Sequence, residues 1–299
     1  MAIANLIDFD FLRQRSLAAV VSALVVLLAL AEAVNAFVAP SLAPTESDWR
    51  AAATAVRAGY RPGDLIVAAP AWADPLMRLQ LGDLVPVSIA ARMDAARFGR
   101  IWEISQRGER AADTQGTRLL SSSRHGRLTV NLWEKPAARV LFDFLAEWQK
   151  ASLSVVTPDR GEMPCWLAQT KLQCGEGTSL GPELLEIDTA PRSGLAVEPR
   201  ERTTTVLEYP DVPLGRELAV AAGLHNVWLR KAGDGKVHMR VLVDGRELGA
   251  VDGTNLGGWA LRRLDTSALD GRRGKVRFEI TADKAYGRHF GFAAEARSP

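Results

Sequence analysis

The sequence contains a small set of aromatic and basic side chains that are suited to holding a sugar. Alternation along residues 225–230 directs Trp228 and Arg230 outward, Trp259 follows two glycines, and Tyr286 and His289 lie in one loop. An exposed indole stacks on the apolar face of a sugar ring while neighbouring polar groups bind its hydroxyls. We therefore predict a binding site at these five residues. In the alternative interpretation, Trp228 is covered by the first domain or closes the edge of the sandwich.

No motif in the chain indicates catalysis. Gly-x-Ser-x-Gly, a P-loop, a Gly-x-Gly-x-x-Gly turn after a strand and His-Glu-x-x-His are all absent. Ser121–Ser123 near His125 have the residue types of a nucleophile and a base, and Glu183 with Glu186 could flank a glycosidic bond. Ordinary polar hairpin residues and surface carboxylates explain both sets. We assign no catalytic residue and keep an enzyme with an unrecognised carboxylate site as an alternative.

Metal binding is not predicted either. The four histidines have no ligand spacing on a single element, and Asp252, Asp265 and Asp270 fall in turn segments, where Asp is favoured by local hydrogen bonding. Oxygen ligands from such loops also suit calcium, and this remains an alternative. We therefore expect no metal and no cofactor.

Cys165 and Cys174 are the only cysteines of the chain. A pair this close forms a hairpin-closing disulfide in an oxidising compartment. The segment between them contains no histidine, so a metal site is disfavoured. We predict a structural disulfide, with two free thiols as the alternative.

Charge and composition exclude some partners. The 37 basic and 35 acidic residues give a net charge of +2, and 47% of the residues are hydrophobic. This is the composition of a folded globular protein, without the clustered basic surface of a nucleic-acid-binding protein. We expect no nucleic-acid partner.

The N-terminus contains a membrane-targeting segment. Residues 16–38 are predominantly apolar and about as long as the roughly 20 residues with which a helix crosses a bilayer. The positive-inside rule, applied to Arg13 and Arg15, places residues 1–15 in the cytoplasm and the rest of the chain outside. We predict a single-pass protein of the inner (cytoplasmic) membrane that contacts the lipid bilayer through residues 16–38.

Two other interpretations of this segment remain. Val34-Asn35-Ala36 resembles a signal-peptidase site, but the long N-terminal region carries Asp8 and Asp10, and the apolar run continues past the site. A cleaved signal sequence would export the rest of the chain as well. A buried helix of a soluble protein would not.

The exported part divides into two regions after a linker at 39–46. In residues 47–150, helices and strands alternate: a helix beginning at Thr45 or Ser47, strands at 65–69 and 100–105, a helix at 74–81, a hairpin at 117–133 and a helix at 140–150. This order indicates a small mixed α/β domain.

Residues 151–299 have a different sequence pattern. Apolar and polar residues alternate along 236–243 and 275–281 and again around Phe290 and Phe292, with Asp-Gly turns between the runs. Half-buried antiparallel strands of this kind predict a β-sandwich. The predicted fold class is therefore α+β and multidomain: an N-terminal transmembrane helix, a small mixed α/β domain, and a jelly-roll-like β-sandwich.

Two family resemblances accompany these patterns. Asp48-Trp49, Pro62–Val67, Arg100–Ser105 and His125–Val130 resemble the soluble tail domain of bacterial dolichyl-phosphate-mannose protein mannosyltransferase-like glycosyltransferases. Those enzymes have many membrane helices and keep their catalytic carboxylates between them, whereas this chain has one candidate helix. The resemblance therefore implies a place in envelope glycan assembly and transfers no catalytic residue.

The second resemblance is to galactose-binding-like jelly-roll domains. It rests on Val241–Gly245, Gly258-Trp259, Leu264–Ser267 with Gly271, and Phe290–Phe292. Members of that group often bind sugars, and many are purely structural.

Together these features give a functional hypothesis. We expect a non-catalytic carbohydrate-binding or accessory module whose partner is an envelope glycan or a membrane-embedded glycan-assembly protein. The alternatives are a carbohydrate-active enzyme and a structural subunit of a membrane complex.

Overall fold

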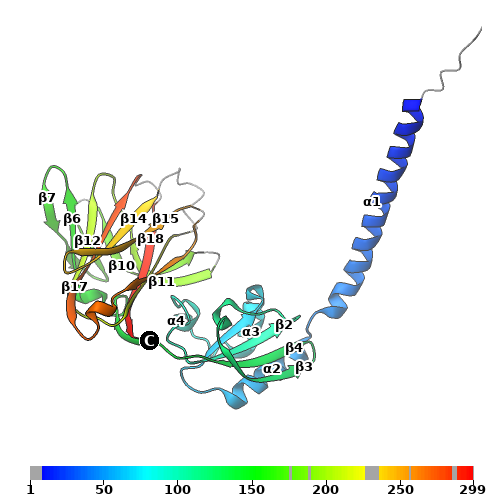
Figure 1. Cartoon of the computed structure of the whole chain (residues 1–299), viewed down its shortest axis with the longest axis horizontal. Coiled ribbons are helices and arrows are strands. Elements are labelled where there is room, and N and C mark those ends of the chain that lie inside the picture. The colour runs from blue at the N-terminus through cyan, green and yellow to red at the C-terminus, as the bar shows by residue number, and fades with distance from the viewer. Residues whose placement is uncertain are drawn as a thin grey trace, which may run out of the picture.

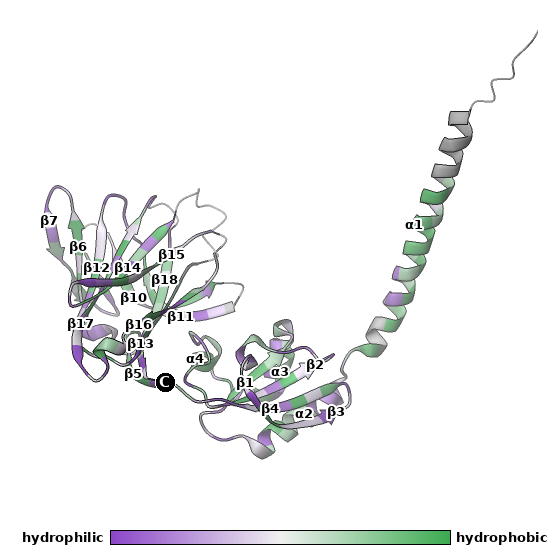
Figure 2. Ribbon diagram, viewed as in Figure 1, coloured by the Kyte–Doolittle hydropathy of each residue, from purple (hydrophilic) through white to green (hydrophobic). Residues whose placement is uncertain are grey.

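The computed structural model describes residues 9–174, 177–187, 190–225, 236–255, 257–284 and 288–298. It begins with a long helix, α1 (Phe9–Leu42), which projects away from the rest of the molecule (Figure 1). Within α1, the segment Ala19–Val38 has a mean hydropathy of 2.2 and none of it is buried against the domains. Most of this segment is coloured as hydrophobic in Figure 2, with a hydrophilic band towards its C-terminal end. This is the composition and length of a membrane span, and a signal sequence has the same properties.

The connection after α1 is shorter than the predicted linker. α1 continues to Leu42, and α2 (Glu46–Gly59) begins four residues later. Thr45 caps α2 because its hydroxyl accepts from the backbone N–H of Asp48, whose carboxylate in turn accepts from the backbone N–H of Thr45. This reciprocal capping box fixes the start of the helix where the sequence predicted it.

The small domain is built on a four-stranded sheet in the order β1-β2-β4-β3. β1 (Leu65–Ala69) runs parallel to β2 (Arg100–Gln106), and β4 (Leu128–Glu134) is antiparallel to both β2 and β3 (Arg118–His125). α2 and α3 (Asp74–Leu81) pack on one face, where they bury Trp49, Val56, Met77, Trp102 and Ile104. The short helix α4 (Val87–Ala90) follows. The predicted helices at 45–59 and 74–81, the strands and the hairpin are confirmed.

The C-terminal region is a sandwich of two antiparallel sheets (Figure 1). The first sheet has the order β16-β13-β18-β11-β10-β9-β8, and β5 also pairs with β18. Its strands are β5 (Arg139–Asp143), β8 (Trp166–Ala168), β9 (Lys171–Gln173), β10 (Ser179–Ile187), β11 (Ala190–Val197), β13 (Glu217–Leu224), β16 (Ala260–Asp265) and β18 (Phe290–Ser298).

The second sheet has the order β15-β14-β17-β12-β6-β7. Its strands are β6 (Ser152–Thr157), β7 (Gly161–Pro164), β12 (Thr204–Pro213), β14 (Val237–Val243), β15 (Arg246–Gly253) and β17 (Arg273–Ala282). The fold class predicted from the sequence, a mixed α/β domain followed by a jelly-roll-like sandwich, is confirmed.

One continuous core fills the space between the two sheets. Inward-facing residues such as Leu218, Val220, Met239, Phe278 and Phe292 are at most 1% exposed. Burial of each side chain of this size stabilises the fold by roughly 1.5–3 kcal/mol before entropy is counted. The core therefore supplies a large share of the stability of the sandwich.

The helix predicted at 140–150 is wrong. Residues 139–143 form β5, which pairs with β18, and a single 3-10 turn follows at Trp148–Lys150. Phe144 and Trp148 enter the sandwich core, and the Tyr209 hydroxyl donates to the Phe144 carbonyl oxygen at 2.8 Å. Contact with the sandwich has overridden the helical spacing of these apolar residues.

A disulfide joins Cys165 and Cys174, as the sequence predicted. Cys165 lies where the chain passes from β7 in one sheet to β8 in the other, and the β8–β9 hairpin lies between the two cysteines. The disulfide therefore stabilises the segment at the edge of the sandwich in which the chain passes from one sheet to the other.

A charged network connects the small domain to the sandwich. Arg297 of β18, 1% exposed, donates to both carboxylate oxygens of Asp94 at 2.8 and 2.9 Å and to Glu295 at 2.7 Å. Arg97 forms ion pairs with Glu295 and Asp143, and the Ser193 amide donates to the Ala91 carbonyl oxygen at 2.8 Å. Burial alone would raise the pKa of Asp94, but the hydrogen bonds from Arg297 hold it below its ordinary value.

We predict that Arg297→Ala lowers the free energy of unfolding by about 3–5 kcal/mol, because it leaves the largely buried Asp94 carboxylate without its counter-ion and leaves Glu295 with Arg97 alone. Chemical denaturation of the detergent-solubilised chain measures this change. Arg50→Ala is the matched control: its ion pair with Glu46 is 66% and 74% exposed, and such a pair contributes at most about 1 kcal/mol. Equal effects of the two substitutions would contradict a structural role for the network.

Candidate functional site

The five predicted ligand-binding residues are only partly described by the structure. Trp228, Arg230 and Tyr286 lie outside the described residues. Trp259 directly precedes β16 and His289 directly precedes β18, two strands that flank β13 in the same sheet. Their loops are linked, since the guanidinium group of Arg288 donates to the side-chain oxygen of Asn255. The structure therefore brings Trp259 and His289 to the same end of the sandwich.

Trp259 lies partly buried beside an apolar cluster on the outer face of this sheet. The cluster consists of Leu185, Ile187 and Ala196 from the β10–β11 hairpin, and the indole packs against it. The sequence allows this close packing because Gly223 and Gly291 are paired opposite each other in β13 and β18. A Cβ atom on Gly291 would lie 2.0 Å from Leu185, and one on Gly223 would lie 3.0 Å from Ile187. The indole therefore rests on an apolar floor and is not a freely exposed platform.

A cluster of imidazoles and carboxylates lies beside this floor. His289 is 14% exposed, and its ring nitrogens lie 3.2 Å from Glu198 and 3.3 Å from Glu183. The ring of His225, at the end of β13, meets that of His289 edge to face at 5.5 Å. We call Glu183, Glu198, His225, Trp259 and His289 the loop-end cluster.

The loop-end cluster combines two kinds of recognition. Carboxylate oxygens accept hydrogen bonds from sugar hydroxyls, while imidazole nitrogens donate or accept according to their tautomer. Trp259 and its floor supply apolar contact. Glu183, Glu198 and His225 were not among the predicted ligand residues, because their approach depends on strands that are far apart in the sequence.

The surroundings of His225 favour its neutral form. Burial, and after it the proximity of His289, lower the pKa of the His225 ring, while Glu183 and Glu186 oppose the shift. A neutral imidazole suits hydrogen bonding to an uncharged hydroxyl.

The residues considered for catalysis are not arranged as an active site. The Ser123 hydroxyl and His125 Nε2 are 2.9 Å apart on β3, where Ser123 is exposed and His125 is partly exposed. Within the described residues no carboxylate hydrogen-bonds His125. Glu183 and Glu186 are three residues apart on β10, so their side chains leave the strand on opposite faces. They therefore do not flank one bond.

The aspartates considered for calcium are engaged locally. Asp252 binds Lys236 and His238, and Asp265 accepts from the Ser267 amide at 2.9 Å. Among the described residues, no group of three or more His, Cys, Asp or Glu side chains is placed to hold a metal.

The most buried carboxylate of the small domain is also fully engaged. Glu103, 1% exposed, accepts from Asn131, Trp133, Thr114 and the Ala111 amide at 2.7–3.1 Å. Four donors around one carboxylate anchor the 107–116 loop to the sheet, and this explains its burial without catalysis.

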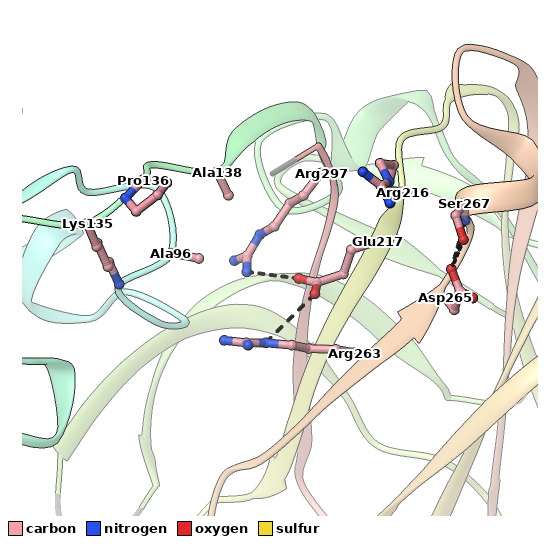
Figure 3. A pocket seen from close by; sticks show the side chains of 10 residues that line it. All are labelled: Ala96, Lys135, Pro136, Ala138, Arg216, Glu217, Arg263, Asp265, Ser267 and Arg297. Carbon is pink, nitrogen blue, oxygen red and sulfur yellow. Dashed lines mark hydrogen bonds and ion pairs between the residues drawn. The ribbon is translucent and has the colours of Figure 1, made fainter. Parts of the chain in front are cut away.

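A separate hollow of about 450 Å³ opens between the domains. We call it the interdomain pocket (Figure 3). Figure 3 shows Lys135, Pro136 and Ala138 on one side and Arg216, Glu217, Arg263, Asp265 and Ser267 on the other, with Arg297 between them. Its lining is dominated by charged side chains, unlike the loop-end cluster with its apolar floor.

Comparisons with known proteins do not assign a family. No family model matches the chain, and no curated protein matches it. These results give no support to the resemblance between residues 47–150 and the mannosyltransferase tail domain, which therefore remains an expectation.

Several solved structures show weak similarity. A structure of the CBM51-2 and INT domains of ZmpB from Clostridium perfringens has a TM-score of 0.30 at 10% identity, covering 66% of this chain and 33% of that chain. The CBM51 from C. perfringens GH95 in complex with methyl-galactose has a TM-score of 0.27 at 13% identity, covering 44% and 91%. The family 11 carbohydrate-binding module of Clostridium thermocellum, in complex with a mixed-linked tetrasaccharide, has a TM-score of 0.23 at 8% identity, covering 49% and 94%.

This chain thus spans only about a third of the length of the ZmpB structure. At these identities and TM-scores the similarity by itself assigns neither a fold nor a ligand. The description of the sandwich rests on its own strand pairing.

We predict that the chain loses stability as the pH falls below about 6.5, in part through His225. Its pKa in the folded state lies below the unfolded value, so folding favours the neutral ring; this contribution is complete above the unfolded pKa and is lost as the ring is protonated. The test compares the thermal unfolding midpoints of the chain and of His225→Asn between pH 7.5 and 5, roughly the range in which His titrates. The variant should show a smaller decrease. Parallel pH curves would contradict the assignment.

Proposed function

We propose that this chain is a single-pass membrane protein that holds its two domains outside the cytoplasm and binds a glycan at the loop end of its sandwich. It would act as a non-catalytic accessory module in cell-envelope glycan assembly. The observation that carries the proposal is the pairing of a partly buried indole, on an apolar floor, with two imidazoles and two carboxylates. Apolar contact on one side and hydrogen-bonding groups on the other are what a sugar ring requires.

Anchoring through α1 supports the same proposal. The apolar segment Ala19–Val38 is preceded by Arg13 and Arg15, and only three residues separate the end of α1 from α2. A span with this charge distribution leaves the following domains close to the outer membrane–water interface. A module held there would meet glycans that are assembled or displayed at the membrane.

A second candidate function is docking to a membrane-embedded partner through the small domain. Trp72, Leu76 and Leu79 are 66%, 42% and 78% exposed and follow one another at helical spacing. Exposed large apolar side chains on one face favour a protein contact. This stripe lies in the other domain and does not overlap with the loop-end cluster.

We predict that Trp259→Ala weakens binding of the full chain to its envelope glycan by at least about tenfold, because loss of a buried aromatic contact commonly costs more than 1.4 kcal/mol. A glycan array followed by calorimetry on the chain in nanodiscs measures it. Glu198→Gln, which removes a charge at nearly constant volume, should weaken binding less strongly. Trp72→Ala is the matched aromatic control.

Trp259→Phe is the control for misfolding, because it retains the packing on Leu185 and Ile187. It should bind the glycan more tightly than Trp259→Ala. Unchanged affinity in Trp259→Ala, or the absence of binding to any envelope glycan, would overturn the glycan proposal. In the second case the apolar stripe becomes the surface to test with membrane partners.

We predict that export of the chain determines whether Cys165 and Cys174 form a disulfide or remain free thiols. In cells, Cys165 and Cys174 should resist a thiol-reactive mass tag after acid quenching, because they are bonded in an oxidising compartment. Deleting residues 16–38 should leave both thiols reactive, since the chain would stay in the reducing cytoplasm. Reactive thiols in the full-length chain would contradict export.

A further inference from the structure

We propose that the interdomain pocket binds an anionic ligand: a carboxylate or phosphate group carried on a body of about the size of a monosaccharide. Lys135 from the small domain and Arg216 and Arg263 from the sandwich would contact the anion. The inference rests on the lining of this pocket and is independent of glycan binding at the loop-end cluster.

The first argument is the distribution of charge. Four basic side chains, Lys135, Arg216, Arg263 and Arg297, line the pocket together with only two acidic ones, Glu217 and Asp265. Arg297 is already neutralised by Asp94 and Glu295, with which it makes its shortest contacts. The other three cations are therefore the groups available to an incoming anion.

The two acidic groups of the lining compensate these cations weakly. Glu217 lies 3.7 Å from Arg297 and 3.9 Å from Arg263, at the outer limit of an ion pair. Asp265 accepts from both the amide and the hydroxyl of Ser267. Within the described part of the chain, the side chains of Lys135 and Arg216 form neither a hydrogen bond nor an ion pair.

The surroundings of Lys135 provide the second argument. Its side chain is half-buried where the chain leaves β4, and its backbone N–H donates to the Gly99 carbonyl oxygen at 2.9 Å, which fixes its position. Burial lowers the pKa of the Lys135 ammonium group, Asp94 and Asp113 oppose this, and Arg263 and Arg297 add to it. A bound anion would supply the close counter-charge that this ammonium lacks.

Geometry provides the third argument. Figure 3 shows the guanidinium groups of Arg263 and Arg297 directed towards the side of the pocket that carries Lys135. Each domain thus contributes cations to one space, and the buried Arg297–Asp94 pair holds the two sides together. Guanidinium groups bind carboxylate and phosphate with two parallel hydrogen bonds.

The size of the pocket exceeds that of a bare oxyanion. Its volume of about 450 Å³ is within the range of small-molecule sites. A second hollow of about 510 Å³ shares Lys135 and Pro136 with it. The two arginines that line this second hollow are already paired, Arg100 with Asp64 and Arg118 with Glu134. The space continues past Lys135 and leaves room for a body attached to the anion, such as an acidic sugar or a sugar phosphate.

The test is calorimetric titration of the full chain in zwitterionic nanodiscs with inorganic phosphate, glucuronate and, as the uncharged match, glucose. We expect phosphate or glucuronate to bind and the affinity to decrease with added salt. Lys135→Gln and Arg263→Gln should each weaken binding about tenfold, since each removes one charge-assisted hydrogen bond. Lys135→Arg should retain most of it.

Arg246→Gln is the control, because it removes an equal charge from an exposed turn of the second sheet. Binding of phosphate alone would indicate a phosphorylated ligand, and binding of glucuronate alone an acidic sugar; either result supports the proposal. Equal losses in Arg246→Gln and Lys135→Gln would overturn it, as would no response to either anion. Loss of anion binding in Trp259→Ala would place the anion site at the loop-end cluster and would also overturn the proposal for the interdomain pocket. Failure of glycan binding alone would not affect that proposal.

Discussion

The structure depends on one buried ion pair, between Arg297 of the last strand and Asp94 of the small domain. Both groups are largely withdrawn from water, so the pair is stable only because Arg297 also binds Glu295 and Asp94 accepts a backbone N–H from Ala96. This network couples the C-terminus of the sandwich to a loop about 200 residues earlier in the chain. Among the described residues, contacts between α4 and β11 and a backbone hydrogen bond from Ser193 to Ala91 also join the two domains.

The same network shapes the interdomain pocket. Arg297 is neutralised by Asp94 and Glu295, whereas Arg216 and Arg263 share the lining with Lys135, and the Glu217 carboxylate lies 3.9 Å from Arg263. The pocket is thus a consequence of how the domains are joined and not of either fold alone. The loop-end cluster has the opposite origin, since each of its residues lies in a strand of one sheet or directly beside the end of one. Its apolar floor exists because two paired glycines let a hairpin pack on the outer face of that sheet.

Local patterns in the sequence were sufficient to predict most elements of the small domain and a few strands of the sandwich. Thr45 and Asp48 mark the start of α2, and alternation along 236–243 and 275–281 marks two central strands, β14 and β17. Residues 140–150 show where such reasoning fails: their apolar spacing fits a helix, but the Phe144 amide bonds to Ala294 and its ring packs among Tyr209 and Phe278. A contact so distant in the sequence leaves no local signal.

The candidate sites were less predictable for the same reason. Trp259 and His289 could be selected by residue type, but Glu183, Glu198 and His225 join them only through the order of strands in the sheet. No periodicity pairs Lys135 with Arg263, which are more than 120 residues apart. The two proposed sites also differ in the ligands that they suit, because an imidazole beside an apolar floor suits an uncharged sugar and converging cations suit an acid. A chain that carries both proposed sites would be able to engage a glycan that has neutral and anionic groups together.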